Sequence, residues 1–263
     1  MLSIIIIAKN EEKLLPRLLR SIRRQDYTDY EVILADAKST DKTRVIARQH
    51  GCRIVDGGLP SKGRNNGAKA AKGDVLLFLD ADVVLPDHFL SSNMRAFSRY
   101  DVGTPRYVPH SKDPIDHVFY FLYHVWVWTF ALFNIPHAGG FCIFCRRSLW
   151  KSVTFPEDVH YSEDMAFVLR CVKKGGRFGL LGGVPICVSV RRFHKDGRLR
   201  TGLRYLYYGI YRLIYGDQHK APFEYQLHGG SNVGKEGSKA RGTDAGSDRR
   251  TRASKKNKIF LRK

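Results

Sequence analysis

Residues 3–12 read SIIIIAKNEE, and this stretch decides how the rest of the sequence is interpreted. Its aliphatic part, Ser3–Ala8, is nearly uninterrupted, which is typical of a strand buried on both faces of a sheet. Leucines and isoleucines then recur between Leu14 and Ile22 at three- and four-residue spacing, with Pro16 tolerated in an early turn. That spacing predicts a helix packed on the sheet.

The same alternation of strand and helix continues to about residue 80. Further strands are expected at Glu31–Ala35, Arg53–Val55 and Val75–Leu79. Helices are expected after the capping residues Ser39–Asp41 and over the small residues of Asn66–Ala71. This order predicts an α/β fold with a mostly parallel central sheet flanked by helices, in which ligands bind at the carboxyl ends of the strands.

The composition limits the kinds of binding partner but does not select one. Hydrophobic residues make up 43% of the 263 residues and the net charge is +20, so we expect a sizeable core and an anionic partner. Nucleic acid, an acidic membrane surface and a phosphorylated small molecule all fit that charge. Five scattered cysteines argue against a disulfide framework, and Ser3–Ala8 is too short for a signal-peptide core, so we expect a reduced, cytosolic setting. The apolar run Phe141–Cys145 holds Cys142 and Cys145, and it predicts a core strand rather than a zinc site.

Two later segments depart from the alternation. Val118–Phe133 contains eight aromatic residues and is shorter than the roughly 20 residues that span a bilayer. Two interpretations stay open: a buried helix pair, or an interfacial helix or lipid-facing groove, since Trp and Tyr favour headgroup depth. Residues 229–263 hold eleven lysines and arginines against three acidic residues, which is typical of a disordered tail attracted to anionic lipid. We therefore expect one domain over residues 1–228, with an aromatic helical segment at about 114–136, and a basic tail.

Acidic or amide side chains follow three of the expected strands. Asp80-Ala81-Asp82 comes directly after Val75–Leu79, and two carboxylates two residues apart can reach one cation. Such hard oxygen ligands suit Mg²⁺ or Mn²⁺. Asp36 follows the second strand, and Asn10 and Glu11 follow the first. Because the carboxyl ends of parallel strands meet at one edge, these residues predict a shared crevice better than they predict isolated helix caps or solvated acids.

In this order the motifs resemble those of family 2 glycosyltransferases of the GT-A fold. The resemblance covers roughly the first 180 residues. It is carried by residues 3–12, DAKSTD at 36–41, GRNNG at 63–67, GDVLLFLDAD at 73–82, GGF at 139–141 and YSED at 161–164. It implies inverting transfer of a sugar from a UDP- or GDP-linked donor with a divalent cation, Mn²⁺ or Mg²⁺.

The resemblance also implies roles for the matched positions. The nucleotide-sugar pocket would be lined after the first two strands by Ala8, Asn10, Glu11 and Asp36. Groups near the base, ribose and metal would be Lys62, Arg64, Asp80, Ala81 and Asp82. Asp164, beside Glu163, would be the catalytic base. We also expect Gly139, Gly140 and Phe141 on the acceptor side, and the aromatic segment places Trp126 and Trp128 beside them.

Elementary chemistry supports these roles. Loss of a nucleoside diphosphate from an anomeric carbon builds charge on the leaving phosphate, which a cation at Asp82 would stabilise. A carboxylate across the sugar would take the acceptor proton, and Asp164 opens a helical pattern that tolerates an acid at its N-terminus. The run after residue 190 is either a solvated basic face or a second phosphate-binding group formed by Arg191 and Arg192, with His194 as a further metal ligand.

The sequence also bears on the acceptor and on two alternative functions. The Q-x-x-R-W motif of processive synthases is absent, so we expect a non-processive enzyme. The aromatic segment and the positive charge favour a polyprenyl phosphate or lipid-linked saccharide acceptor, with the protein peripheral at the inner, cytosolic face of the cell membrane. A sugar-nucleotide-forming nucleotidyltransferase would place a Gly-rich basic loop where Lys9-Asn10-Glu11-Glu12 stands. A nucleic-acid-binding module would not carry acids at three strand ends, so we expect no nucleic acid partner.

Overall fold

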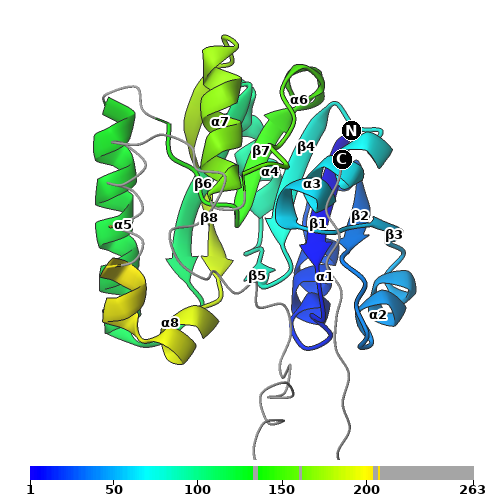
Figure 1. Ribbon diagram of the computed structural model, residues 1–263, viewed down its shortest axis with the longest axis horizontal. Helices are drawn as coiled ribbons and strands as arrows, with labels where there is room; N and C mark the ends of the chain where they lie inside the picture. Colours follow the sequence, from blue (N-terminus) through cyan, green and yellow to red (C-terminus); the bar gives the residue numbers. More distant parts are fainter. Residues whose placement is uncertain (133–135, 160–161, 204–206, 208–263) are drawn as a thin grey trace, which may run out of the picture. The chain divides into compact units, whose positions relative to one another are not determined.

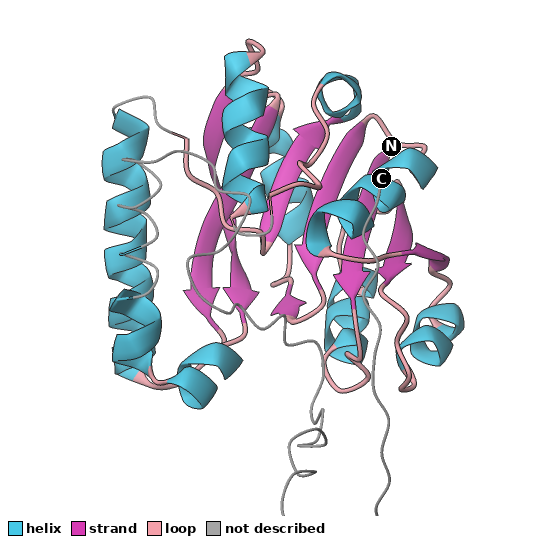
Figure 2. Ribbon diagram, viewed as in Figure 1, coloured by secondary structure: helices cyan, strands magenta, loops and turns pink. Residues whose placement is uncertain are grey.

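The computed structural model of the chain describes residues 1–132, 136–159, 162–203 and 207, and for Leu132, Arg192 and His194 it describes the backbone alone. Within these residues one eight-stranded sheet has the order β3-β2-β1-β4-β7-β6-β8-β5. Helices cover both of its faces (Figures 1 and 2). The basic tail at residues 229–263 lies outside the described residues, so the predicted domain boundary at residue 228 stays a prediction.

The first half of the sheet has the predicted parallel arrangement. Its strands are β1 (Leu2–Ala8), β2 (Tyr30–Asp36), β3 (Arg53–Asp56) and β4 (Val75–Asp80), and neighbours among them pair in parallel. The helices between them are α1 (Leu15–Arg23), α2 (Thr43–Gln49) and α3 (Pro60–Ala70). The α3 helix begins at a proline six residues before the predicted start, because proline fits the first turn of a helix.

The second half inserts an antiparallel strand next to β4. The strands are β5 (Val83–Val84), β6 (Val102–Pro109), β7 (Cys142–Arg146) and β8 (Phe178–Val188). β7 runs antiparallel to both β4 and β6, β6 and β8 are parallel, and β5 is antiparallel to β8. The accompanying helices are α4 (Phe89–Phe97), α5 (Pro114–Leu132), α6 (Arg147–Ser152), α7 (Glu163–Lys173) and α8 (Arg191–Asp196).

Both faces of the central strands are buried, which explains why their sequences are almost continuously apolar. Ile4 of β1 belongs to a core that includes Leu18 of α1, whereas its neighbour Ile5 belongs to a core that includes Phe167 of α7. Successive side chains of a strand point to opposite faces, so each face needs its own apolar set. Cys142 and Cys145 are both buried, unpaired thiols in β7. The prediction of a core strand at this position is confirmed.

The aromatic segment forms a single helix, α5, beside β6 at the edge of the sheet (Figure 1). The interpretation as a buried helix pair is wrong, because one face of this helix is exposed: Phe121 is 66% exposed and Trp128 is 59% exposed. The pattern was ambiguous because apolar residues occupy both faces of the helix. No described helix is long and apolar enough to cross a membrane.

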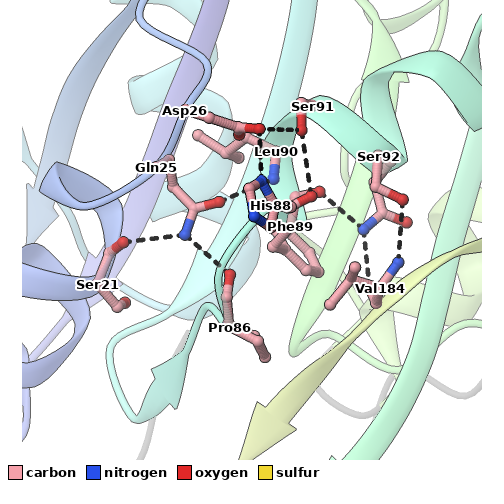
Figure 3. Close-up of polar contacts among 11 residues, drawn as sticks. Ser21, Gln25, Asp26, Pro86, His88, Phe89, Leu90, Ser91, Ser92 and Val184 are labelled. Atoms are coloured by element: carbon pink, nitrogen blue, oxygen red, sulfur yellow. Dashed lines mark hydrogen bonds and ion pairs between the residues drawn. The ribbon is translucent and has the colours of Figure 1, made fainter.

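The segment that follows the acidic motif at residues 80–82 is fastened to the end of α1 (Figure 3). Gln25 donates from Nε2 to the carbonyl oxygen of Pro86 at 2.9 Å and to that of Ser21 at 3.1 Å. Its Oε1 accepts a hydrogen bond from the backbone N–H of Leu90 at 3.0 Å. These bonds are largely buried, so the chain leaves the acidic motif in a fixed direction.

The first turns of α4 are anchored on two sides (Figure 3). Asp26 Oδ2 lies 2.7 Å from His88 Nδ1 and accepts a hydrogen bond from Ser91 Oγ at 2.8 Å. On the other side, Asn93 Nδ2 donates to the carbonyl oxygen of Val184 in β8 at 2.8 Å. The α4 helix is therefore anchored to the residues that follow α1 on one side and to β8 on the other.

Candidate active site

The three predicted strand ends meet at one edge of the sheet. In the central strand β1, Ala8 pairs with Asp36 of β2 and Ile7 pairs with Asp80 of β4. Paired residues of parallel strands share a face and successive residues alternate, so the Asp36 and Asp80 side chains lie on opposite faces. Asp36 lies on the face covered by α2, where Arg44 Nη1 is 3.5 Å from its Oδ2. A ligand that reaches both carboxylates must therefore pass from one face of the sheet to the other over the carboxyl end of β1.

Asp36 offers a buried acceptor at this edge. Its Oδ2 accepts a hydrogen bond from the backbone N–H of Ser39 at 3.1 Å, and the whole residue is 3% exposed. Its Oδ1 is buried and has no hydrogen-bond partner among the described residues. A buried acceptor without a partner is rare in folded proteins, so the N–H or O–H group of a ligand is a natural complement for it.

The loops after β1 and β2 are joined to each other. Asn10, in the left-handed region at φ 54°, accepts from the backbone N–H of Thr40 through Oδ1 at 2.8 Å, and its own N–H donates to Ser39 Oγ at 2.9 Å. The backbone N–H of Glu11 donates to Thr43 Oγ1 at 2.8 Å. These cross-links hold the predicted nucleotide-binding residues of the two loops as one unit.

Arg64 is the centre of the best-defined charged group. Its side chain is 3% exposed, and its Nη1 lies 2.8 Å from Glu163 Oε1 while its Nη2 lies 3.1 Å from Asp80 Oδ1. Nη2 also donates to the carbonyl oxygen of Gly140 at 3.2 Å. Burial opposes the charge of Arg64, yet the carboxylates of Asp80, Glu163 and Asp164 hold its pKa above the ordinary value.

Gly140 permits the close approach of these groups. A Cβ atom at this position would lie 2.6 Å from Arg64 Nη2 and 3.1 Å from Asp164 Oδ2. Asp164 therefore lies against the same glycine as the Arg64 guanidinium. The structure thus brings together five residues that the sequence had placed in four separate motifs: Arg64, Asp80, Gly140, Glu163 and Asp164.

A second charged group forms around Arg191 at the start of α8. Arg191 Nη2 lies 3.1 Å from Glu11 Oε1 and 3.6 Å from Asp82 Oδ2. Burial raises the pKa of Glu11, Arg191 opposes that shift, and the nearby charge of Asp80 adds to it. Asp80 belongs to the Arg64 group and Asp82 to the Arg191 group, and only Ala81 separates them in the chain, so the two charged groups are neighbours. The predicted Arg192 and His194 side chains lie outside the described residues.

Asp80 and Asp82 are the carboxylates that fit a divalent cation. Among the described residues, no group of three or more His, Cys, Asp and Glu side chains could hold a metal ion. Hard oxygen donors from the protein must then be completed by other ligands, and diphosphate oxygens and water are the usual ones for Mg²⁺. The donor set therefore fits a cation that arrives with a diphosphate better than a permanently bound structural metal.

The remaining predicted residues occupy more peripheral positions. Ala8 and Ala81 are buried, and Lys62 is exposed on α3. Phe141 packs with its ring 5.6 Å from that of Tyr107, next to Gly139. Of the predicted acceptor-side tryptophans, Trp126 is partly buried, with its ring centroid 4.5 Å from that of Phe130 and the two rings tilted by 43°. Trp128 is exposed.

Tyr107 supports the glycine pair and was not predicted. Its hydroxyl accepts from the backbone N–H of Gly139 and donates to the carbonyl oxygen of Gly139, both at 3.1 Å, and it also contacts Thr104 Oγ1. Burial raises the pKa of Tyr107 well above its usual value, so this hydroxyl remains protonated at neutral pH. No local motif marks Tyr107, because its partner lies 32 residues away in the sequence.

Arg17 and His110 were also missed. They line a small hollow beside Asp82, together with Leu14, Val83, Val84 and Ser189. Burial and the charge of Arg17 lower the pKa of His110, so this histidine is mainly neutral at pH 7. The periodicity of the first helix gave no signal for Arg17, since helical periodicity does not show which polar residues face a site.

The chain is similar to known proteins in sequence and in fold. The sequence model described as "Glycosyl transferase family 2" matches residues 3–153. The 4,4'-diaponeurosporenoate glycosyltransferase of Staphylococcus haemolyticus is 35% identical over 108 residues, which are 37% of this chain and 28% of the relative. The GalNAc(5)-diNAcBac-PP-undecaprenol beta-1,3-glucosyltransferase of Campylobacter jejuni is 32% identical over 105 residues, 36% of this chain and 33% of the relative. The matched segment thus spans about a third or less of these two relatives.

Solved structures show the same fold. The mannosyltransferase PcManGT from Pyrobaculum calidifontis, in complex with GDP-Man and Mn²⁺, has a TM-score of 0.64 at 22% identity and covers 84% of this chain and 65% of that chain. S. aureus TarS 1–349 in complex with UDP has a TM-score of 0.57 at 21% identity, over 72% of this chain and 60% of that chain. The predicted α/β fold of the GT-A class is confirmed by these likenesses.

Proposed function

The chain belongs to glycosyl transferase family 2, and from that premise we propose that it transfers a sugar from a nucleoside diphosphate donor to an acceptor hydroxyl or phosphate, with inversion at the anomeric carbon. The single observation that carries the proposal is the junction of the two charged groups. Arg64 joins Asp80 to Glu163 in one group, Arg191 joins Glu11 to Asp82 in the other, and the two meet at the end of β4.

The donor nucleotide binds across the edge formed by β1, β2 and β4. The unpartnered Oδ1 of Asp36 accepts a hydrogen bond from the base or ribose, as acidic residues at the same place do in dinucleotide sites. The cross-linked Asn10 loop forms the floor of that pocket. Arg191 can leave its carboxylate partners for the diphosphate, which carries more negative charge and fits a guanidinium fork.

A divalent cation, Mn²⁺ or Mg²⁺, belongs to the proposal. Asp80 and Asp82 would hold it, and when bound it would neutralise charge that develops on the leaving diphosphate. A related fold is known in complex with Mn²⁺, which supports this assignment without identifying the ion for this chain. The Arg64 guanidinium keeps the Asp80 side chain in place from the α3 side.

Asp164 is proposed as the catalytic base. When the acceptor is a hydroxyl, inversion by a single displacement needs a base that takes the hydroxyl proton as the oxygen attacks. A phosphate acceptor attacks as an anion and needs no such base. Asp164 stands in the first turn of α7, accepts from the backbone N–H of Met165 at 2.8 Å, and lies next to Gly140. Its neighbour Glu163 pairs with Arg64 at 2.8 Å. The base role is assigned to Asp164 from its position in the motif at residues 161–164.

For the acceptor we propose a polyprenyl phosphate or a lipid-linked saccharide, reached at the cytosolic face of the membrane. The C. jejuni relative is named for an undecaprenol diphosphate-linked acceptor, and the S. haemolyticus relative is named for 4,4'-diaponeurosporenoate. The net charge of +20 suits a surface of anionic headgroups. The acids at the strand ends would repel a nucleic acid backbone, which keeps that partner out of the proposal.

A donor screen tests the function. The full chain is incubated with UDP- and GDP-linked sugars in the presence of Mn²⁺ or Mg²⁺, with a polyprenyl phosphate as acceptor and with buffer alone. Wild type is expected to release nucleoside diphosphate from at least one donor, and Asp82→Ala is expected to lose most of that activity. Release from Asp82→Ala at the wild-type rate contradicts the metal assignment, and no release from any donor contradicts the transferase proposal.

A further inference from the structure

The α5 helix presents an apolar face to solvent. Six of its large hydrophobic side chains are between 44% and 66% exposed: Ile115, Val118, Phe121, Leu122, Val125 and Trp128. They recur at three- and four-residue spacing, so they lie on one side of the helix, which we call the outer face. Large contiguous apolar patches are uncommon on the surfaces of monomeric soluble proteins and usually mark an interaction site. We therefore expect the outer face to bind a partner.

The opposite side of α5 already provides its packing against the domain. Tyr120 meets Phe193 of α8 with a ring distance of 5.9 Å, His124 accepts from or donates to the backbone of Tyr107, and Val127 is 4% exposed. The helix is therefore held without any contribution from the outer face. This division leaves the helix lying along the surface of the domain.

Charge around the outer face favours an anionic partner. Asp116 is the one acidic residue within α5, and it is fully buried with Arg198 Nε 2.7 Å from its Oδ1. Asp113, just before the helix, is paired with the same arginine. Lys112 comes just before α5, and Arg200 lies in the segment that follows α8. Both are basic and exposed. Arg198 thus pairs with both acids. Among the described residues near the apolar face, the exposed basic residues Lys112, Lys195 and Arg200 outnumber the exposed acid Asp196.

A short segment after α8 extends the patch. Gly202 lies against α5 so closely that a Cβ atom there would be 3.1 Å from Phe119 Cε1. From this segment Leu199 and Leu203 are 68% and 56% exposed. Two parts of the chain that are about 80 residues apart therefore contribute apolar side chains near one another.

We propose that the outer face of α5, with Leu199 and Leu203, docks on an anionic lipid bilayer with the helix parallel to the membrane surface. A helix with one face fixed to protein and the other apolar and uncharged matches an interfacial helix, in which Trp and Phe enter the boundary between headgroups and acyl chains. Basic neighbours add attraction to anionic headgroups. The docking surface is argued from the exposed residues alone. It rests on the proposed function only in the role assigned to it, which is to bring the active site to a lipid-linked acceptor.

The test uses co-sedimentation of the full chain with vesicles of phosphatidylcholine and phosphatidylglycerol. The variant Phe121→Gln/Trp128→Gln changes two outer-face residues, and Val45→Gln/Leu59→Gln is the matched control, since Val45 and Leu59 are 49% and 45% exposed elsewhere on the domain. Binding is measured at 0.15 M and 0.5 M salt, because high salt screens attraction by the basic tail. At 0.5 M salt the outer-face variant is expected to bind roughly tenfold more weakly than wild type, and the control is expected to bind as wild type does.

Three results would overturn the proposal. One is equal vesicle binding by wild type and the outer-face variant at both salt concentrations. Another is a wild-type dimer in light scattering that the same substitutions dissociate, with no vesicle affinity, which would assign the face to a second copy. A third is no vesicle binding by wild type at either salt concentration, which would exclude a lipid bilayer as the partner of this face. Melting temperatures verify that each variant is folded, and binding of the donor nucleotide, measured in parallel, separates failure of the docking surface from failure of the proposed function.

Discussion

Arg191 and Glu11 are 180 residues apart in the sequence and form a two-bond ion pair. Arg191 Nη2 lies 3.1 Å from Glu11 Oε1, and its Nη1 lies 3.3 Å from Oε2. The same Nη2 is 3.6 Å from Asp82 Oδ2. One arginine of α8 therefore spans the loop after β1 and the acidic motif after β4, at the place where the diphosphate of a donor is expected.

Replacing this arginine should weaken donor binding. Arg191→Ala removes a guanidinium that can form charge-assisted hydrogen bonds with the diphosphate, each worth about 1.5–3 kcal/mol. We expect the dissociation constant of the donor's nucleoside diphosphate to rise roughly tenfold or more, as measured by titration calorimetry. Lys195→Ala, an exposed residue of the same helix, is the control and should leave the constant unchanged. Equal binding by wild type and Arg191→Ala would show that α8 does not contact the diphosphate.

The raised pKa of Glu11 predicts a specific dependence of stability on pH. A carboxyl group whose pKa is higher in the folded state favours folding most when it is protonated, and this contribution is lost as pH rises through the folded-state pKa. Glu11→Gln does not titrate. The melting temperature of the variant minus that of wild type should therefore become more positive between pH 4 and pH 7. A difference that is constant over this range, or that becomes more negative, contradicts the shift.

The Arg64 network predicts a large loss of stability. Arg64→Met leaves the carboxylates of Asp80 and Glu163 without this buried cation, and breaking a buried ion pair in this way costs about 3–5 kcal/mol. We expect the free energy of unfolding in urea to fall by about 3 kcal/mol. Lys62→Met, on the exposed side of the same helix, should change it by less than about 0.5 kcal/mol. A small loss in Arg64→Met would mean that the network is solvated rather than buried.

The parallel half of the sheet could be predicted from the sequence, because the residues of each strand are enough to identify that strand. The strands β1, β2 and β4 each contain an apolar run, and a polar residue follows each run: Lys9, Asp36 and Asp80. The strand β7 was also predicted as a core strand, but not its place between β4 and β6 or its antiparallel direction. That placement depends on pairing with strands 40 to 70 residues away, and the short segment 141–145 contains no signal for it.

The candidate site could be predicted as a set of residues but not as a set of contacts. Asp80, Gly140 and Asp164 were identified from motifs, whereas the role of Arg64 in joining them was not. Its partner Glu163 is 99 residues away in the sequence, and that distance is closed only when α3 and α7 pack on the same face of the sheet. Sequence patterns likewise could not tell the inner face of α5 from its outer face, because both are apolar.

Asp164 should be needed for turnover and not for donor binding. Asp164→Asn keeps the size of the side chain and removes its ability to take a proton. Loss of a general base typically lowers kcat by about 10²–10⁴-fold, and we expect a loss in this range in the donor–acceptor assay with a hydroxyl acceptor. The dissociation constant of the nucleoside diphosphate should stay within about twofold of wild type, since the base acts on the acceptor. A variant with wild-type kcat would require another residue as the base.

Gly140→Ala should disturb catalysis by displacing two charged groups at once. The new Cβ would lie 2.6 Å from Arg64 Nη2 and 3.1 Å from Asp164 Oδ2, so at least one of these groups must move. A misplacement of about 1 Å at a reacting centre can lower the rate about 10²-fold, and we expect kcat to fall by that order while nucleotide affinity is retained. Gly182→Ala is the control, because no atom lies within 4 Å of a Cβ at that position. Its kcat should equal that of wild type. If both alanine variants turn over at the wild-type rate, Arg64 and Asp164 do not need their observed positions for the reaction, and the assignment of Asp164 as the base fails with them.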